Sequence, residues 1–160
     1  MKNRLALVTI LFLLISGLTS RAQNVIRQAP CTNEFISHQA DSIKKYLATK
    51  GFIVVKEASM AMESEYEMPV IVPLTEGSWY QFVFIGDITS KLYEVRMFDW
   101  NEKQVVYQKK MWGDVDGNVI SYDYIPKFTE YHMIKPVQVN KKKKKDLCGY
   151  VMLLKKVPHS

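Results

Sequence analysis

The fold is decided by one apolar stretch in the middle of the chain, Trp79-Tyr80-Gln81-Phe82-Val83-Phe84-Ile85. Successive side chains of an extended strand point to opposite faces. One face therefore carries Trp79, Val83 and Ile85, and the other carries Tyr80, Phe82 and Phe84. Because both faces are apolar, the stretch predicts a strand that is covered on both sides. We expect Trp79 to belong to the core.

Seven further segments have the length and the β-branched or aromatic content of strands, namely residues 52–57, 68–74, 92–98, 104–111, 119–125, 131–139 and 147–154. Polar residues 99–102 indicate a hairpin, and Asp116-Gly117 predicts a type I′ turn. Pro69 and Pro73 restrict their segment to a sheet edge. About eight short strands indicate a mainly β domain, an antiparallel β-sandwich of jelly-roll type.

One amphipathic helix is predicted ahead of the strands, over residues 33–50. Apolar side chains recur there at spacings of three and four, namely Phe35, Ile36, Ala40, Ile43 and Leu47. Thr32 or Asn33 can cap its start, and Gly51 supplies its end. We expect this helix to cover one open face or one end of the sandwich.

The first 22 residues have the three parts of an export signal. Lys2 and Arg4 form the charged start, residues 5–18 are mostly apolar, and Ser20 and Ala22 are the small residues before a cut. The apolar part is shorter than the roughly 20 residues that span a bilayer. Cleavage would leave residues 23–160 as a single domain, soluble, periplasmic or secreted, with no transmembrane segment.

The formal net charge of +6 is unevenly distributed along the chain. Three of the positive charges lie in residues 1–22, which hold no acid, and five lie in the run Lys141, Lys142, Lys143, Lys144 and Lys145. The rest of the chain is nearly neutral. Nucleic-acid binding proteins usually spread their basic residues over a face or groove, so we expect no nucleic-acid partner.

The two cysteines, Cys31 and Cys148, lie near opposite ends of the predicted mature chain. An oxidising compartment favours their pairing. Neither cysteine has an adjacent histidine that could serve as the base of a catalytic thiol. We therefore predict one disulfide between them.

Three groups of residues are candidates for binding. Trp100 occupies a predicted hairpin tip, where an exposed indole can stack on a sugar ring or anchor a partner. The alternative, which we favour, is that it folds back over a sheet edge, and Trp112 carries the same ambiguity. The five lysines can contact an anionic surface or form a solvated loop that discourages edge pairing. We favour the loop.

Metal and catalytic sites have little support in the sequence. Asp114, Asp116 and Asn118 are a weak calcium candidate, because the later ligands of an EF-hand loop are missing. Met60, Met62 and Met68 suit either a core or a thioether copper site. No zinc spacing, nucleophile elbow or phosphate loop occurs. We expect no cofactor and no enzymatic activity.

Residues 77–140 resemble the prepeptidase-C-terminal-type β-sandwich of exported bacterial proteins. The matching features are Ser78-Trp79-Tyr80-Gln81-Phe82, Val95-Arg96-Met97-Phe98-Asp99 and Tyr131. The chain departs from that family at Thr129-Glu130-Tyr131, where the family has Gly-x-Tyr. The resemblance implies an accessory or binding domain and carries no catalytic residue. The whole chain is also similar to small exported bacterial proteins.

These observations predict an exported, non-catalytic binding or accessory module at the bacterial cell envelope. Its ligand would be a protein or a glycan. The alternative is a structural or assembly subunit of an envelope complex, in which residues 68–74 would extend a neighbour's sheet. A small hydrolase is the third hypothesis, and it requires clustered carboxylates or histidines in a pocket.

Overall fold

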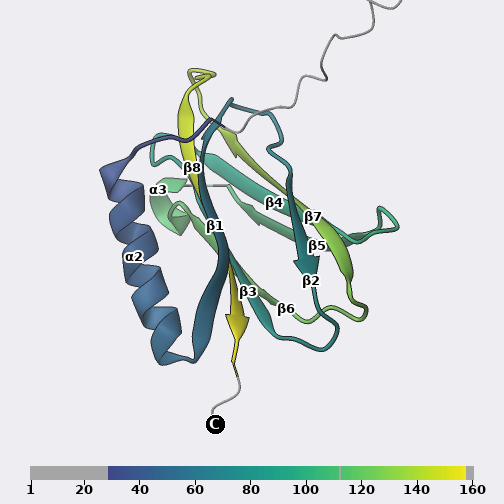
Figure 1. Ribbon diagram of the computed structural model, residues 1–160. Helices are drawn as coiled ribbons and strands as arrows, with labels where there is room; N and C mark the ends of the chain where they lie inside the picture. Colours follow the sequence, from purple (N-terminus) through teal and green to yellow (C-terminus); the bar gives the residue numbers. More distant parts are fainter. Residues whose placement is uncertain (1–28, 112, 158–160) are drawn as a thin grey trace, which may run out of the picture.

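The computed structural model describes residues 29–111 and 113–157 (Figure 1). The predicted signal segment, residues 1–22, lies outside this part of the chain. In chain order the elements are α2 (Glu34–Thr49), β1 (Phe52–Met62), β2 (Val70–Leu74), β3 (Tyr80–Ile85), β4 (Leu92–Phe98), β5 (Gln104–Lys110), α3 (Gly113–Asp116), β6 (Val119–Tyr124), β7 (Glu130–Val139) and β8 (Leu147–Lys156).

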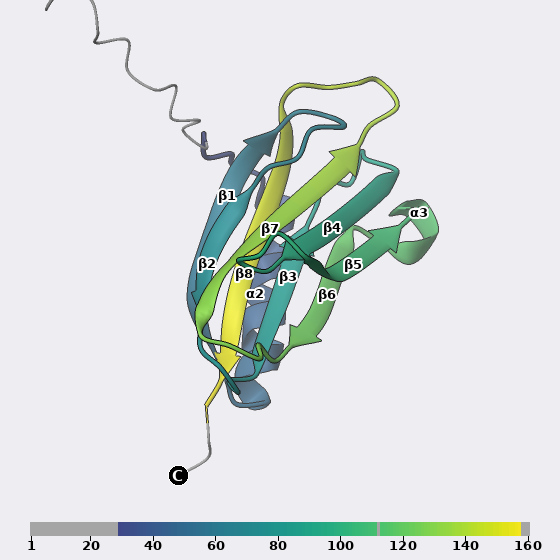
Figure 2. The same cartoon turned by 90° about the vertical axis from the view of Figure 1, so that its right-hand side faces the viewer.

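The strands form two antiparallel sheets of four, which lie face to face (Figure 2). Sheet A has the strand order β1-β8-β3-β6, and sheet B has the order β2-β7-β4-β5. Consecutive strands thus alternate between the sheets, except for the β4–β5 hairpin. This is the connectivity of a jelly roll. The prediction of an eight-stranded jelly-roll-like sandwich with one N-terminal amphipathic helix is confirmed.

Strand β3 is central in sheet A and is covered on both faces, as its sequence predicts. Tyr80, Phe82 and Phe84 pack into the core between the two sheets. Val83 and Ile85 face the other way, into a second cluster beneath α2. Trp79 corrects our expectation, because its side chain is 42% exposed. It precedes the strand at a point where the apolar cover of the helix ends, so it borders the core without entering it.

Helix α2 runs along the outer face of sheet A, on the side away from sheet B (Figure 1). Asn33 caps its start, since the side-chain oxygen accepts a hydrogen bond from the backbone N of Ile36 at 3.1 Å. Ile36, Ala40 and Leu47 are its buried residues. Gly51 follows its end with φ of 78°, in the left-handed region that favours glycine.

A polar network fastens the helix to sheet A. The Tyr150 hydroxyl donates to Glu57 Oε2 at 2.6 Å, and the Lys44 ammonium lies 3.2 Å from that oxygen and 3.1 Å from Asp41. The hydrogen bond from Tyr150, and then the bond from Lys44, lower the pKa of Glu57 against the opposing effect of burial. Burial and the bond to Glu57 raise the pKa of Tyr150 to about 12. The network therefore favours an ionised Glu57.

The end of β1 and the connection from β5 to β6 differ from the sequence prediction. Strand β1 continues to Met62 instead of ending near residue 57, and Met60 and Met62 are fully buried in the sandwich. These two sulfurs are therefore core atoms. The predicted type I′ turn at Asp116-Gly117 is wrong, because Asp116 ends α3 and only Gly117 has a positive φ. This connection crosses from sheet B to sheet A, which a two-residue hairpin turn cannot do.

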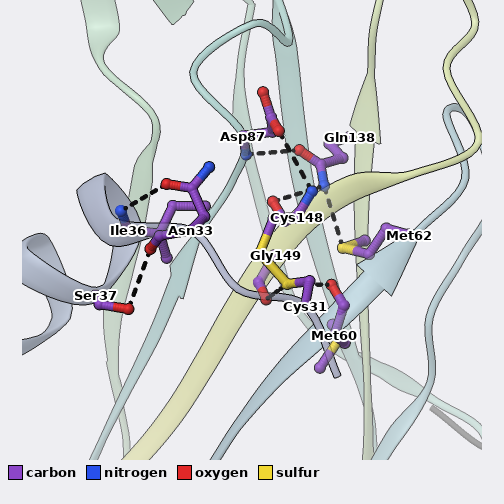
Figure 3. The surroundings of a disulfide bond; sticks show 10 residues. All are labelled: Cys31, Asn33, Ile36, Ser37, Met60, Met62, Asp87, Gln138, Cys148 and Gly149. Carbon is purple, nitrogen blue, oxygen red and sulfur yellow. Dashed lines mark hydrogen bonds between the residues drawn. A yellow bond between two sulfur atoms is a disulfide. The ribbon is translucent and has the colours of Figure 1, made fainter. Parts of the chain in front are cut away.

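The predicted disulfide between Cys31 and Cys148 is present, with the two Cα atoms 5.6 Å apart and a sequence separation of 117 (Figure 3). It ties the segment before α2 to the start of β8. Hydrogen bonds hold Cys148 on both sides. Its backbone N donates to the Asp87 carboxylate at 3.3 Å, and its carbonyl accepts from the Gln138 side chain at 3.3 Å. Gln138 in turn accepts from the backbone N of Asp87 at 2.8 Å.

Replacing both cysteines, Cys31→Ser with Cys148→Ser, should lower the free energy of unfolding by about 4 kcal/mol. A crosslink over a loop of this length removes that much chain entropy from the unfolded state in the loop-closure model. Urea unfolding of the double variant and of the oxidised wild type measures the difference. A change of less than about 1 kcal/mol would contradict this account.

The pH dependence of stability tests the Glu57 network. Because the folded state lowers the pKa of Glu57, its stabilisation is fully present above the ordinary value of 4.5 and is lost as pH falls through the lower folded-state value. Melting temperatures measured below pH 4.5 should therefore fall more steeply for the wild type than for Glu57→Gln. Glu76→Gln, on the β2–β3 turn, is the control and should follow the wild type.

Candidate functional site

The β4–β5 hairpin presents Trp100 at its tip. The Asp99 carboxylate closes the tip, because its Oδ1 accepts hydrogen bonds from the backbone N of Asn101 and of Lys103, each at 2.9 Å. Glu102 adopts φ of 59° to complete the turn. Hydrogen bonds between the Asp99 carboxylate and the backbone therefore order the tip that carries Trp100.

Trp100 packs against Tyr131, the second residue of β7. The ring centroids are 6.2 Å apart and the ring planes are inclined by 47°. Trp100 remains 69% exposed and Tyr131 54% exposed. The sequence allowed either an exposed indole or one folded back over a sheet edge. The structure has elements of both, since the indole leans over sheet B and still presents most of its surface to solvent. We call Trp100 and Tyr131 the aromatic platform.

Strand register explains why apolar side chains gather beside the platform. Tyr131 pairs with Pro73, and Met133 pairs with Ile71, so all four side chains lie on the outer face of sheet B. The platform, Ile71 and Met133 line a hollow of about 230 Å³ together with Asp99, Glu102 and His132. The sequence predicted Trp100, but nothing in it indicated that residue 131 would lie beside residue 100.

A buried histidine lies beneath this outer face. His132 is 1% exposed, and its Nε2 is 3.1 Å from the hydroxyl of Tyr124 and 3.8 Å from Glu130. Burial raises the pKa of Tyr124. The other ring nitrogen, Nδ1, is the one buried side-chain nitrogen or oxygen without a hydrogen-bond partner in the described part of the chain.

The charged residues further along the outer face of sheet B pair with one another. Arg96 contacts both Glu94 and Glu67, and Lys135 lies 3.0 Å from Glu67. The Tyr107 hydroxyl donates to Glu94 at 3.3 Å. These polar groups are paired with one another. The aromatic platform, in contrast, presents exposed rings on this face.

The second predicted tryptophan site and the calcium candidate fall near α3. Trp112 lies outside the described residues, and the side chain of Asp114 is not described. Asn118 is buried, and its amide donates to the Gly86 carbonyl and to Gln39, each at 2.8 Å. Its oxygen accepts from Gln39 at 2.9 Å. Asn118 is thus engaged within the fold instead of being presented to an ion.

The lysine run forms the exposed connection between β7 and β8, visible at the top of Figure 2. Lys143 lies 3.9 Å from Glu65, and Lys145 lies 3.9 Å from Glu63, both in the connection from β1 to β2. Lys141, Lys142 and Lys144 line a small hollow of about 270 Å³. Leu92 pairs with Val139 at this end of sheet B and Phe98 pairs with Met133 at the other, so the structure does not bring the lysines and Trp100 together.

A wider groove of about 530 Å³ lies between α2 and the outer face of β3 and β6. Trp79 lines it, edge-on to Phe52, with the ring centroids 5.7 Å apart. The Lys156 ammonium lies over both rings, 5.1 Å from the centroid of Phe52 and 5.5 Å from that of Trp79. The Lys156 ammonium thus already covers the Trp79 indole, so we place the candidate site at Trp100.

Comparisons with known proteins give remote structural similarities and no family. No family model and no curated protein matches the chain. A structure of AlgX from Pseudomonas aeruginosa matches with a TM-score of 0.45 and 8% identity, over 66% of this chain and 27% of AlgX. The chain thus spans about a quarter of that protein.

Two carbohydrate-binding modules are among the other matches. The module described as CBM4 matches with a TM-score of 0.39 and 13% identity, over 66% of this chain and 77% of the module. TmCBM61, solved in complex with β-1,4-galactotriose, matches with a TM-score of 0.36 and 13% identity, over 67% of this chain and 83% of the module. At such low scores we transfer no ligand and no residue from these proteins.

Among the described residues, no group of three or more histidine, cysteine, aspartate or glutamate side chains is placed to hold a metal ion. No helix in this part of the chain combines the length and the hydropathy needed to cross a membrane.

Strand β2 is an edge of sheet B, as its prolines predict, and this edge is protected. The Lys56 ammonium, from the neighbouring edge strand β1, donates to the Ile71 carbonyl at 2.9 Å. Pro73, two residues further on, has the same orientation in the strand and has no N–H to offer. Two of the groups that an added strand would pair with are therefore unavailable.

Unblocking this edge should promote self-association. In the double variant Lys56→Ala with Pro73→Thr, the Ile71 carbonyl and a new N–H become free on the open side of β2. Light scattering across a concentration series should then give a higher mean mass than for the wild type, and Lys45→Ala should give the wild-type result. An unchanged mass would mean that these two residues do not protect the edge.

Proposed function

We propose that this chain is an exported, non-catalytic binding module of the bacterial cell envelope, and that its ligand is a glycan bound on the aromatic platform. The observation that carries the proposal is the pair of exposed rings, Trp100 and Tyr131, beside a hollow of about 230 Å³. Sugar rings have apolar C–H faces that pack against aromatic side chains, and their hydroxyls bond to nearby polar groups.

The scaffold supports binding because it orders the platform in advance. Asp99 locks the hairpin tip, and Tyr131 lies within a paired strand. Little conformational freedom of the backbone that carries these two side chains remains to be lost when a ligand arrives. A rigid aromatic pair is therefore well suited to the weak stacking contacts that a sugar offers.

The size of the hollow favours a glycan over a protein partner. A stable protein interface covers about 800 Å² on each side. The platform with Ile71 and Met133 forms one compact patch at the end of a sheet, next to charged groups that already pair among themselves. A patch of this kind matches a few sugar units better than a protein surface.

The arrangement also supports a role in binding over one in hydrolysis. A glycosidase needs a carboxylic acid held protonated by burial in an apolar environment. Glu102 is exposed, and Asp99 uses one oxygen to accept two backbone hydrogen bonds. Neither carboxyl group has the surroundings of a general acid.

Binding to purified polysaccharides tests the proposal. Isothermal titration or pull-down with cellulose, chitin, chitosan, galactan and peptidoglycan sacculi should identify at least one ligand. Trp100→Ala should weaken its binding at least tenfold, the usual effect of truncating an aromatic hot spot. The free energy of unfolding should change by no more than about 0.5 kcal/mol, because the side chain is exposed.

Tyr66→Ala is the matched control, since Tyr66 is also exposed, at 64%, but lies in the β1–β2 connection, away from the platform. It should bind like the wild type. If no polysaccharide binds, or if Trp100→Ala binds as well as Tyr66→Ala, the platform is not a glycan site.

A further inference from the structure

The hollow beside the aromatic platform contains two carboxylates and no lining cation. Among the described residues that line it, Asp99 and Glu102 are the carboxylates, and no lysine or arginine is present. Lys103, from the same hairpin tip, lines the neighbouring hollow, which Asp99 also borders. Negative charge therefore faces the space in which a ligand of the platform would lie.

These carboxylates differ from the others on the outer face of sheet B. Glu67 and Glu94 are neutralised by Arg96 and Lys135. Among the described residues, Asp99 Oδ2 has no hydrogen-bond partner, although Oδ1 is used in the turn. The Glu102 carboxylate has no hydrogen bond or ion pair within the same part of the chain. The platform thus keeps two acceptor groups that the fold itself does not use.

We propose that the ligand carries a protonated primary amine, so that the substrate class is a glycan containing free amino sugars. This inference rests on the proposed glycan-binding function and names its ligand. Two independent features of the site favour a cation. The faces of Trp100 and Tyr131 attract positive charge through their ring quadrupoles, and Asp99 and Glu102 attract it directly.

The donor and acceptor chemistry selects a primary amine over a quaternary one. A primary ammonium group has three N–H donors, which match the free oxygens of Asp99 and Glu102. A quaternary ammonium group cannot donate and is bound by an aromatic cage. The platform has two rings and two carboxylates. It therefore offers hydrogen-bond acceptors in the place where an aromatic cage would have additional rings.

Three oligosaccharides of equal length test the inference, because they share one backbone and differ only at the second ring carbon. The glucosamine oligomer carries an ammonium group there, the N-acetylglucosamine oligomer an acetamide, and the glucose oligomer a hydroxyl. Titrations at about pH 5.5 keep carboxylates ionised and the sugar amines protonated. The glucosamine oligomer should bind at least tenfold more tightly than the other two.

Glu102→Gln should reduce this preference at least tenfold, because it removes a charge while keeping the shape of the side chain. Glu76→Gln is the matched control and should keep the preference. Trp100→Ala should weaken binding of all three oligomers. Added salt should weaken binding of the glucosamine oligomer alone.

The outcomes separate this inference from the proposed function. Equal binding of the three oligomers, or an unchanged preference in Glu102→Gln, would overturn the amino-sugar assignment and leave the glycan site intact. Binding of oligolysine as tight as that of the glucosamine oligomer would show that charge alone is recognised, which also overturns the assignment. If no oligomer or polysaccharide binds, both proposals fail.

Discussion

Burial of β3 on both of its faces is the constraint on which the rest of the structure depends. Phe82 and Phe84 face sheet B, and Val83 and Ile85 face α2, all with 3% exposure or less. Each side chain contributes about 1.5 to 3 kcal/mol when it leaves water. A central strand of this kind needs a layer on each side, which requires both the second sheet and the helix.

The same constraint decides which surfaces stay open for binding. Helix α2 covers the outer face of sheet A, and the disulfide and the Lys44–Glu57–Tyr150 network hold it near that sheet. Within residues 29–111 and 113–157 no helix covers the outer face of sheet B, so its side chains are exposed to solvent or contact one another. Part of that face carries charges that pair with one another, and its far end presents two exposed aromatic rings beside the carboxylates of Asp99 and Glu102.

Patterns that are local in sequence were predicted well. The alternation in residues 79–85, the helix spacing from Ile36 to Leu47 and the hairpin at residues 99–102 all depend on neighbours a few positions apart. The pairing of Cys31 with Cys148 was predicted because only two cysteines were available. Failures came where tertiary context decides the result. Trp79 lies on the predicted face of its strand but beyond the part of sheet A that α2 covers. Helix α3 takes the place of the predicted type I′ turn because the chain passes from sheet B to sheet A there.

The candidate site shows the same difference between local patterns and tertiary context. Trp100 could be predicted because the turn residues around it mark a hairpin tip, where an indole has no structural task. Tyr131 could not, because its position beside Trp100 follows from the pairing of β7 with β4. The paired residues of these strands are 35 or more positions apart in sequence, as in Phe98 with Met133. The free carboxylate oxygens follow from hydrogen bonds formed within the tip. A hairpin tip closed by the Asp99 carboxylate can thus present exposed acidic and aromatic side chains beside the sheet.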